Sequence, residues 1–103
     1  MFESPDGISL IEKTRATKVF ISASGIHDKL GVTCSNNYEV PTKCAIIGSS
    51  LERILLVNSD KFGKVKSSYF ADLSDFNTII TDSGISQEWI NYISQLNINL
   101  IIV

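Results

Sequence analysis

The stretch R-I-L-L-V-N, residues 53–58, decides the fold class, because it is a short and nearly continuous run of apolar side chains. Residues 18–23, 78–81 and 98–103 form runs of similar character. Strands that are apolar runs, without alternation, are typical of parallel sheets whose two faces are both covered by helices. The sequence therefore predicts an α/β fold built on a parallel sheet.

Helical periodicity lies between these runs. Residues 38–51 are predicted to form a helix whose inward stripe comprises Val40, Cys44, Ile47 and Leu51. A second predicted helix is capped by Ser86, ends at Asn97 and has an inward stripe of Trp89, Ile90, Ile93 and Leu96. Strands that alternate with helices predict right-handed crossovers between parallel neighbours.

The remaining segments are short or rich in turn residues. Ser4 and Pro5 predict the start of a helix near the N-terminus, because proline is favoured at the first helical position. Residues 24–37 contain two glycines and several Asn, Asp and Ser residues, which predict turns. Residues 69–73 are predicted to form a further short segment.

Composition excludes several classes of protein. The chain has 103 residues, of which 44% are hydrophobic and 19% charged, which is too apolar for a disordered chain. A length of 103 residues is enough for one small domain. No apolar run approaches the ~18 residues that a membrane-spanning helix needs, so no membrane partner is predicted. A formal charge of −2 argues against binding nucleic acid by electrostatics alone.

The two cysteines indicate the compartment. Cys34 and Cys44 are too few for a disulfide framework, and their spacing lacks the C-x-x-C pairs of a zinc site. We predict two reduced thiols and a cytoplasmic location. Residues 1–10 have no basic segment before an apolar core, so no signal peptide is predicted.

Polar loops follow three of the predicted strands. They span residues 22–28, 58–63 and 81–84, and each contains a glycine and hydroxyl or carboxylate side chains. Ligands of parallel sheets bind at the carboxyl ends of the strands, so these loops predict a cleft for a polar ligand. Lys61 is the cation nearest a strand end and is the candidate partner of a phosphate or carboxylate.

Plainer interpretations stand beside that prediction. Turn residues gather at strand ends in every α/β domain, and Lys61, Lys64 and Lys66 also fit a solvated basic loop. His27 fits a solvated loop histidine better than a catalytic base, and the Trp89 stripe fits core packing. The sequence has no G-x-G-x-x-G, no P-loop and no metal-spaced set, so no cofactor or metal is predicted.

Four stretches resemble a known family. They are F-I-S-A-S-G-I-H-D-K-L-G-V-T (20–33), I-L-L-V-N-S-D-K-F-G-K-V (54–65), F-A-D-L-S-D-F (70–76) and I-I-T-D (79–82). Their order and spacing resemble those of the carboxy-terminal sensor domain of DeoR-type transcriptional repressors. The resemblance implies a parallel-sheet, Rossmann-like α/β fold similar to sugar-phosphate isomerases, present here as a partial domain.

The resemblance also implies an effector site for a phosphorylated sugar. Residues 22–25, with Ser22, Ser24 and Gly25, would line it together with Gly31 and Thr33. Lys61 would contact the oxygens or phosphate of the ligand, and Asp82 would lie near the same edge. Asn58 stands where the family usually has Asp, and Asp60 where it has Ser or Thr. Both belong to the predicted site.

The resemblance places residues 1–103 as the carboxy-terminal part of the sensing domain. A helix-turn-helix that contacts operator DNA, and the first part of the sensor, would precede Met1, and a homo-oligomer is expected. Two alternatives remain. One is a small sugar-phosphate isomerase or deaminase in which His27 works with Asp28 or Asp60. The other is an assembly module whose uncovered apolar surface drives association.

Overall fold

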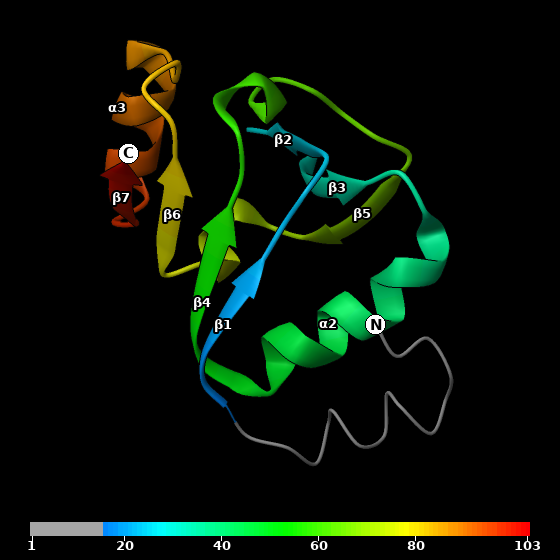
Figure 1. The fold of residues 1–103 in the computed structure, drawn as a ribbon. Helices are drawn as coiled ribbons and strands as arrows, with labels where there is room; N and C mark the ends of the chain where they lie inside the picture. The colour runs from blue at the N-terminus through cyan, green and yellow to red at the C-terminus, as the bar shows by residue number, and fades with distance from the viewer. Residues whose placement is uncertain (1–15) are drawn as a thin grey trace.

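Four parallel strands form the larger of two sheets. The computed structural model describes residues 16–103. Within them the parallel sheet has the strand order β1-β4-β6-β7 (Figure 1). Its strands are β1 (Ala16–Ile21), β4 (Ser50–Leu56), β6 (Thr78–Thr81) and β7 (Asn99–Ile102). Each neighbouring pair is parallel, which confirms the predicted α/β class.

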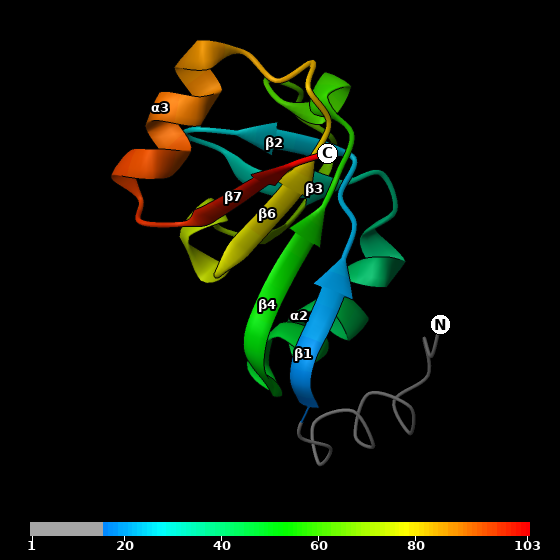
Figure 2. The same cartoon turned by 60° about the vertical axis from the view of Figure 1, so that its left-hand side comes forward.

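The second sheet is small and antiparallel. Its order is β2-β3-β5, with β2 (Gly25–His27), β3 (Gly31–Cys34) and β5 (Ser68–Ala71). The other described elements are α2 (Val40–Gly48), α3 (Gln87–Gln95) and the 3-10 turns η1 (Asn37–Glu39), η2 (Ser59–Lys61) and η3 (Leu73–Asp75). Figure 2 shows α2 and the small sheet behind the parallel sheet.

The core lies between the two sheets. Its largest fully buried side chains are Phe76, Ile26, Leu55, Ile79 and Ile93, which come from both sheets, α3 and the residue after the η3 turn. Fully burying an aliphatic or aromatic side chain of this size contributes about 1.5–3 kcal/mol. Packing of α3 and the small sheet against β4 and β6 therefore holds the strand ends in place.

The described helices and the small sheet cover the same face of the parallel sheet. On the opposite face Phe20 is 60% exposed and Leu56 is 50% exposed. Within residues 16–103 the helices lie on one face only, so the prediction that a helix covers the other face stays a prediction. The parallel strands follow one another in one direction across the sheet, so crossovers of one hand all run on one side.

The helix predicted over residues 38–51 is shorter in the structure. It begins with η1, and α2 ends at Gly48, so that residues 50–52 already belong to β4. Pairing with β1 explains the difference, because Ser50 pairs with Ala16 and Glu52 with Lys18. Such pairing overrides a weak helical preference next to a glycine.

The predicted inward stripe of this helix is also wrong in part. Leu51 lies in β4 and is 79% exposed, and Cys44 is exposed as well. α2 packs between β5 and the parallel sheet, so it buries more than one narrow stripe. Its buried side chains are Thr42, Lys43 and Ala45.

The carboxy-terminal helix agrees with its prediction. The Ser86 hydroxyl accepts the Trp89 backbone N–H at 3.3 Å, and Asn97 ends the helix with a positive φ of 59°. The helix predicted from Ser4 and Pro5 lies outside the described residues. Cys34 and Cys44 are both free, and burial raises the pKa of each thiol. Within residues 16–103, no helix is long and apolar enough to cross a membrane.

Candidate functional site

A cavity of about 290 Å³ lies at the carboxyl ends of the parallel strands. We call it the strand-end cavity. Its described lining residues follow or end β1, β4, β6 and β7: Ser22, Ala23, Leu56, Val57, Asn58, Lys61, Ile80, Thr81, Asp82 and Val103. This volume is near the lower end of the roughly 300–1,000 Å³ typical of small-molecule sites. The cavity therefore suits a small polar ligand with an apolar edge.

Four of the nine predicted site residues meet in this cavity. They are Ser22, Asn58, Lys61 and Asp82, which lie in three loops far apart in the sequence. The parallel register brings these loops together, because β1 pairs with β4 and β4 with β6. The structure therefore brings these four residues to one edge of the sheet, and their contact with an effector stays a prediction.

Lys61 supplies a cation to the cavity. It is the last residue of η2, and its backbone N–H donates to the Asn58 carbonyl at 3.1 Å. Its Nζ lies 3.9 Å from Oδ2 of the exposed Asp60. Such an exposed ion pair contributes little stability, so Lys61 can exchange this partner for an anionic ligand.

Asp82 joins two of the loops at this edge. Its Oδ2 accepts the Ser59 backbone N–H at 3.0 Å, and its Oδ1 accepts the Gly84 N–H at 2.9 Å. A hydrogen bond from the Ser59 hydroxyl is the main reason why the pKa of Asp82 is lowered. The two backbone hydrogen bonds lower this pKa further, because each of them stabilises the charged carboxylate. A Cβ on Gly84 would lie 2.5 Å from the Ser59 Oγ and 3.0 Å from the Asp82 Oδ1, so an alanine there would have to displace these side chains.

Asp82→Asn is expected to make the fold less sensitive to acid. The folded pKa of Asp82 lies below its ordinary value of 3.8. Its carboxylate therefore stabilises the native chain above that value, and the contribution is lost as the pH falls through the folded pKa. Urea unfolding at about pH 7 should show the variant less stable, and the difference should shrink as the pH falls below the ordinary value of 3.8. Asp60→Asn is the control, and a pH-independent deficit in Asp82→Asn would contradict this account.

Five predicted residues do not line the strand-end cavity. Thr33 has a structural role, because its hydroxyl accepts the Lys66 N–H at 2.9 Å and donates to the Gly25 carbonyl at 3.4 Å. Gly25 packs so closely that a Cβ would lie 2.6 Å from the Lys64 carbonyl oxygen. Asp60 is exposed, and within residues 16–103 its one ion pair is with the side chain of Lys61.

The other two belong to the β2–β3 hairpin. The Ser24 N–H donates to the Thr33 carbonyl at 3.0 Å. Gly31 has a φ of +83° and lines a separate cavity of about 170 Å³ beside His27 and Asp28. Direct contact of these five residues with an effector stays a prediction.

Thr81 is a cavity residue that the sequence analysis did not single out. It is 2% exposed, and its hydroxyl has no hydrogen-bond partner within residues 16–103. An unsatisfied buried hydroxyl costs about 1–3 kcal/mol. A ligand or water in the strand-end cavity would offset that cost. Its position as the last residue of β6, just before Asp82, was the available signal.

Lys43 is a second cation near this edge. It lies on α2, is only 4% exposed, and its Nζ donates to the Ser22 carbonyl at 2.9 Å. The Nζ also lies 5.1 Å from the centroid of the Phe70 ring. Lys43 forms no ion pair with the described residues. A buried ammonium without a carboxylate gives the Ser22 loop a positive potential that favours an anion.

Comparison with known proteins gives a family match. Residues 1–83 match the model described as the DeoR C terminal sensor domain. The deoxyribose operon repressor of Escherichia coli K12 is 33% identical over 81 residues, which cover 79% of this chain and 32% of the repressor. The lactose phosphotransferase system repressor of Staphylococcus epidermidis is 36% identical over 75 residues, which cover 73% of this chain and 30% of that protein.

A third relative is an uncharacterized HTH-type transcriptional regulator of Haemophilus influenzae. It is 37% identical over 84 residues, which cover 82% of this chain and 32% of the regulator. The chain therefore spans about a third of the length of these relatives.

Proposed function

The chain belongs to the DeoR C-terminal sensor domain family, and on that premise we propose that it is the effector-binding part of a repressor of sugar catabolism. The proposed effector is a phosphorylated sugar, which the strand-end cavity holds without converting it. The names of two relatives support a sugar-linked role, because one is a deoxyribose operon repressor and the other a lactose phosphotransferase system repressor.

The observation that carries this proposal is the combination of groups around the strand-end cavity. Lys61 offers an ammonium to a phosphate, and the buried Lys43 adds positive potential beneath Ser22. Asn58 both donates and accepts hydrogen bonds, and Asp82 accepts them, which suits sugar hydroxyls. A single ligand with one phosphate and several hydroxyls would bind both the two lysines and the polar side chains of Asn58 and Asp82.

The chain spans about a third of the length of its relatives, so the other functions of a regulator belong to the proposal. We propose that operator DNA is bound by a helix-turn-helix encoded upstream, that the protein works in the cytoplasm, and that it self-associates. Exposed Phe20 and Leu56, on the sheet face that no helix of residues 16–103 covers, support self-association. Light scattering over a concentration series tests it, since a constant mass of 11.3 kDa would contradict it.

A thermal-shift panel tests the effector. Ribose 5-phosphate and glucose 6-phosphate represent the two sugar sizes, and ribose, glucose and inorganic phosphate are the matched controls. A ligand at 100 times its Kd stabilises the native chain by about 2.7 kcal/mol. This corresponds to about 10 °C or more for a domain of this size. The proposal fails if no sugar phosphate raises the melting temperature more than its unphosphorylated sugar does.

Thr81→Val is expected to weaken ligand binding without lowering the melting temperature of the free chain. Valine has the same shape without the unpaired hydroxyl, so the free chain should unfold at the same temperature or a few degrees higher. The shift caused by the sugar phosphate should become smaller. Thr33→Val is the matched control, because its hydroxyl forms two hydrogen bonds and its loss should cost about 1–3 kcal/mol. Equal destabilisation of both variants would contradict this account of Thr81.

A further inference from the structure

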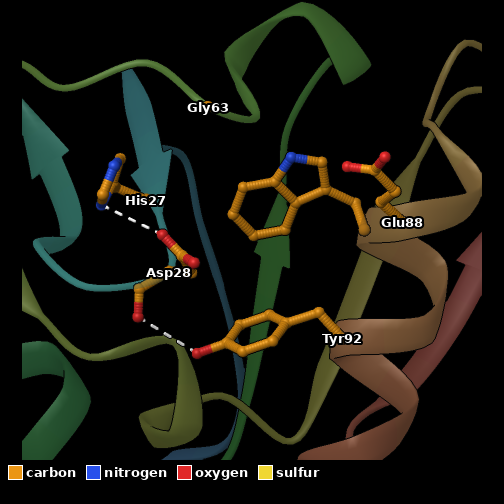
Figure 3. Close-up of a pocket in the computed structure, with 6 residues that line it drawn as sticks. His27, Asp28, Gly63, Glu88 and Tyr92 are labelled. Atoms are coloured by element: carbon orange, nitrogen blue, oxygen red, sulfur yellow. Dashed lines mark hydrogen bonds and ion pairs between the residues drawn. The ribbon is translucent and has the colours of Figure 1, made fainter.

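A second cavity lies between the β2–β3 hairpin and α3. Its volume is about 350 Å³, and its described lining residues are His27, Asp28, Gly63, Glu88, Trp89 and Tyr92. Figure 3 shows His27 and Asp28 on the hairpin side, facing Tyr92 and Glu88 on the helix. We call it the aromatic cavity. It shares no described lining residue with the strand-end cavity.

Aromatic contacts fix one wall of this cavity. The centroid of the Trp89 ring lies 5.2 Å from that of the Phe62 ring. The Trp89 and Tyr92 rings are in edge-on contact, with their centroids 5.7 Å apart. The Tyr92 hydroxyl donates to the Asp28 carbonyl at 3.1 Å, which ties the helix to the hairpin (Figure 3). These contacts hold the two rings that line the cavity in fixed orientations, so a ligand meets preformed aromatic surface.

The charge of the lining is negative. Asp28 and Glu88 are carboxylates, and none of the described lining residues is a lysine or arginine. The Nδ1 of His27 accepts the N–H groups of Lys29 and Leu30, both at 3.1 Å. These bonds place the proton of the neutral ring on Nε2. The same Nδ1 lies 3.3 Å from Oδ1 of Asp28 (Figure 3), which is an ion pair only when His27 is protonated. The neutral ring therefore leaves the charge of Asp28 uncompensated at the cavity.

Aromatic rings and carboxylates together define the kind of ligand. The faces of Trp and Tyr attract cations, and the attraction is strongest where water is displaced. Carboxylates add charge attraction but repel anions. Among the described residues, no three His, Cys, Asp or Glu side chains are arranged to hold a metal ion. An organic cation is therefore favoured over a phosphate or a bare metal.

We propose that the aromatic cavity binds a small organic ammonium ion. Its cationic head would lie against the rings of Trp89 and Tyr92 on one side and face the carboxylates of Asp28 and Glu88 on the other. The family match ends at residue 83, so the helix that supplies three of the lining residues lies beyond it. The proposal concerns a ligand and a cavity different from those of the sugar-phosphate site, and it stands independently of that site.

Choline is the probe, and 3,3-dimethylbutan-1-ol is its neutral isostere. Trp89 is the single tryptophan of the chain, so its fluorescence reports on this cavity directly. Titration of the 103-residue chain with choline should change the fluorescence in a saturable way. The neutral isostere should bind about tenfold more weakly, since it lacks the cation–π and charge attractions. No saturable change with choline, or equal affinity for the two probes, would overturn the proposal.

Charge variants locate the binding. Asp28→Asn and Glu88→Gln should each weaken choline binding roughly threefold to fivefold, the size expected for a partly exposed charge interaction. Glu52→Gln is the control, because its carboxylate pairs with Lys18 at 3.8 Å and does not line the cavity. Circular dichroism checks that each variant is folded. The proposal is overturned if both cavity variants bind choline as tightly as Glu52→Gln does.

Discussion

Lys61→Ala is expected to abolish the rise in melting temperature that a sugar phosphate produces in this chain. Lys61 is the cation among the described lining residues of the strand-end cavity. A hydrogen bond to a charged group contributes about 1.5–3 kcal/mol. Its loss should weaken binding by about tenfold to a hundredfold, which removes the shift at moderate ligand concentration. The measurement is a thermal-shift titration of both proteins with ribose 5-phosphate and glucose 6-phosphate.

Lys64→Ala is the matched control for this variant. Lys64 lies three residues further along the same loop, is exposed and does not line the strand-end cavity. It should keep the full shift. The free Lys61→Ala chain should unfold close to the temperature of the unaltered chain, because the ion pair with Asp60 is exposed. A full ligand shift in Lys61→Ala, or equal losses in both variants, would count against the assigned role.

Gly31→Ala is expected to destabilise the fold by about 2–5 kcal/mol. Gly31 has a φ of +83°, which costs an alanine about 1–2 kcal/mol. A Cβ there would also lie 2.7 Å from the Tyr69 ring and 2.8 Å from the Ala71 carbonyl oxygen. Relieving such contacts typically costs about 1–3 kcal/mol more. Urea unfolding of the variant and the unaltered chain measures the loss.

Gly63→Ala separates the two causes of that loss. Gly63 has a φ of +85°, but nothing lies within 4 Å of the position its Cβ would take. It should therefore lose only the conformational part, about 1–2 kcal/mol. If the two alanine variants lost the same stability, the close packing of β3 against β5 would not be the cause.

Apolar runs and caps made much of the fold predictable. The strand over residues 78–81 and the helix that follows Ser86 have the predicted bounds to within two residues, because apolar strands and side-chain caps are local signals. The runs around residues 18–23, 53–58 and 98–103 also contribute strands to the same parallel sheet. Local sequence was sufficient wherever a single element buried one continuous apolar surface.

The small sheet could not be predicted in the same way. β2 and β3 have three and four residues, and each begins with a glycine, which weakens a strand signal. Their stability comes from long-range pairing of β3 with β5, which is about 35 residues further along the chain. The start of β4 was missed for a similar reason, since pairing with β1 decides it.

The candidate site was predictable at the strand ends but not within the helices. Four predicted residues share the strand-end cavity, because parallel strands bring their carboxyl ends to one edge. Lys43 was missed since a lysine on a helix is usually solvated, and only the packing of α2 beneath Ser22 buries it. The unpaired hydroxyl of Thr81 depends on contacts that no sequence pattern encodes.

Amide NMR during a sugar-phosphate titration tests the central claim most directly. With ribose 5-phosphate or glucose 6-phosphate, whichever gives the larger thermal shift, the account predicts saturable changes in the backbone amide signals of Ser59, Lys61 and Asp82. These residues line or adjoin the strand-end cavity. The Trp89 indole signal should stay nearly constant, because Trp89 lines the aromatic cavity. Changes confined to Trp89 and the hairpin, or no saturable change at all, would contradict a sugar-phosphate sensor at the strand ends.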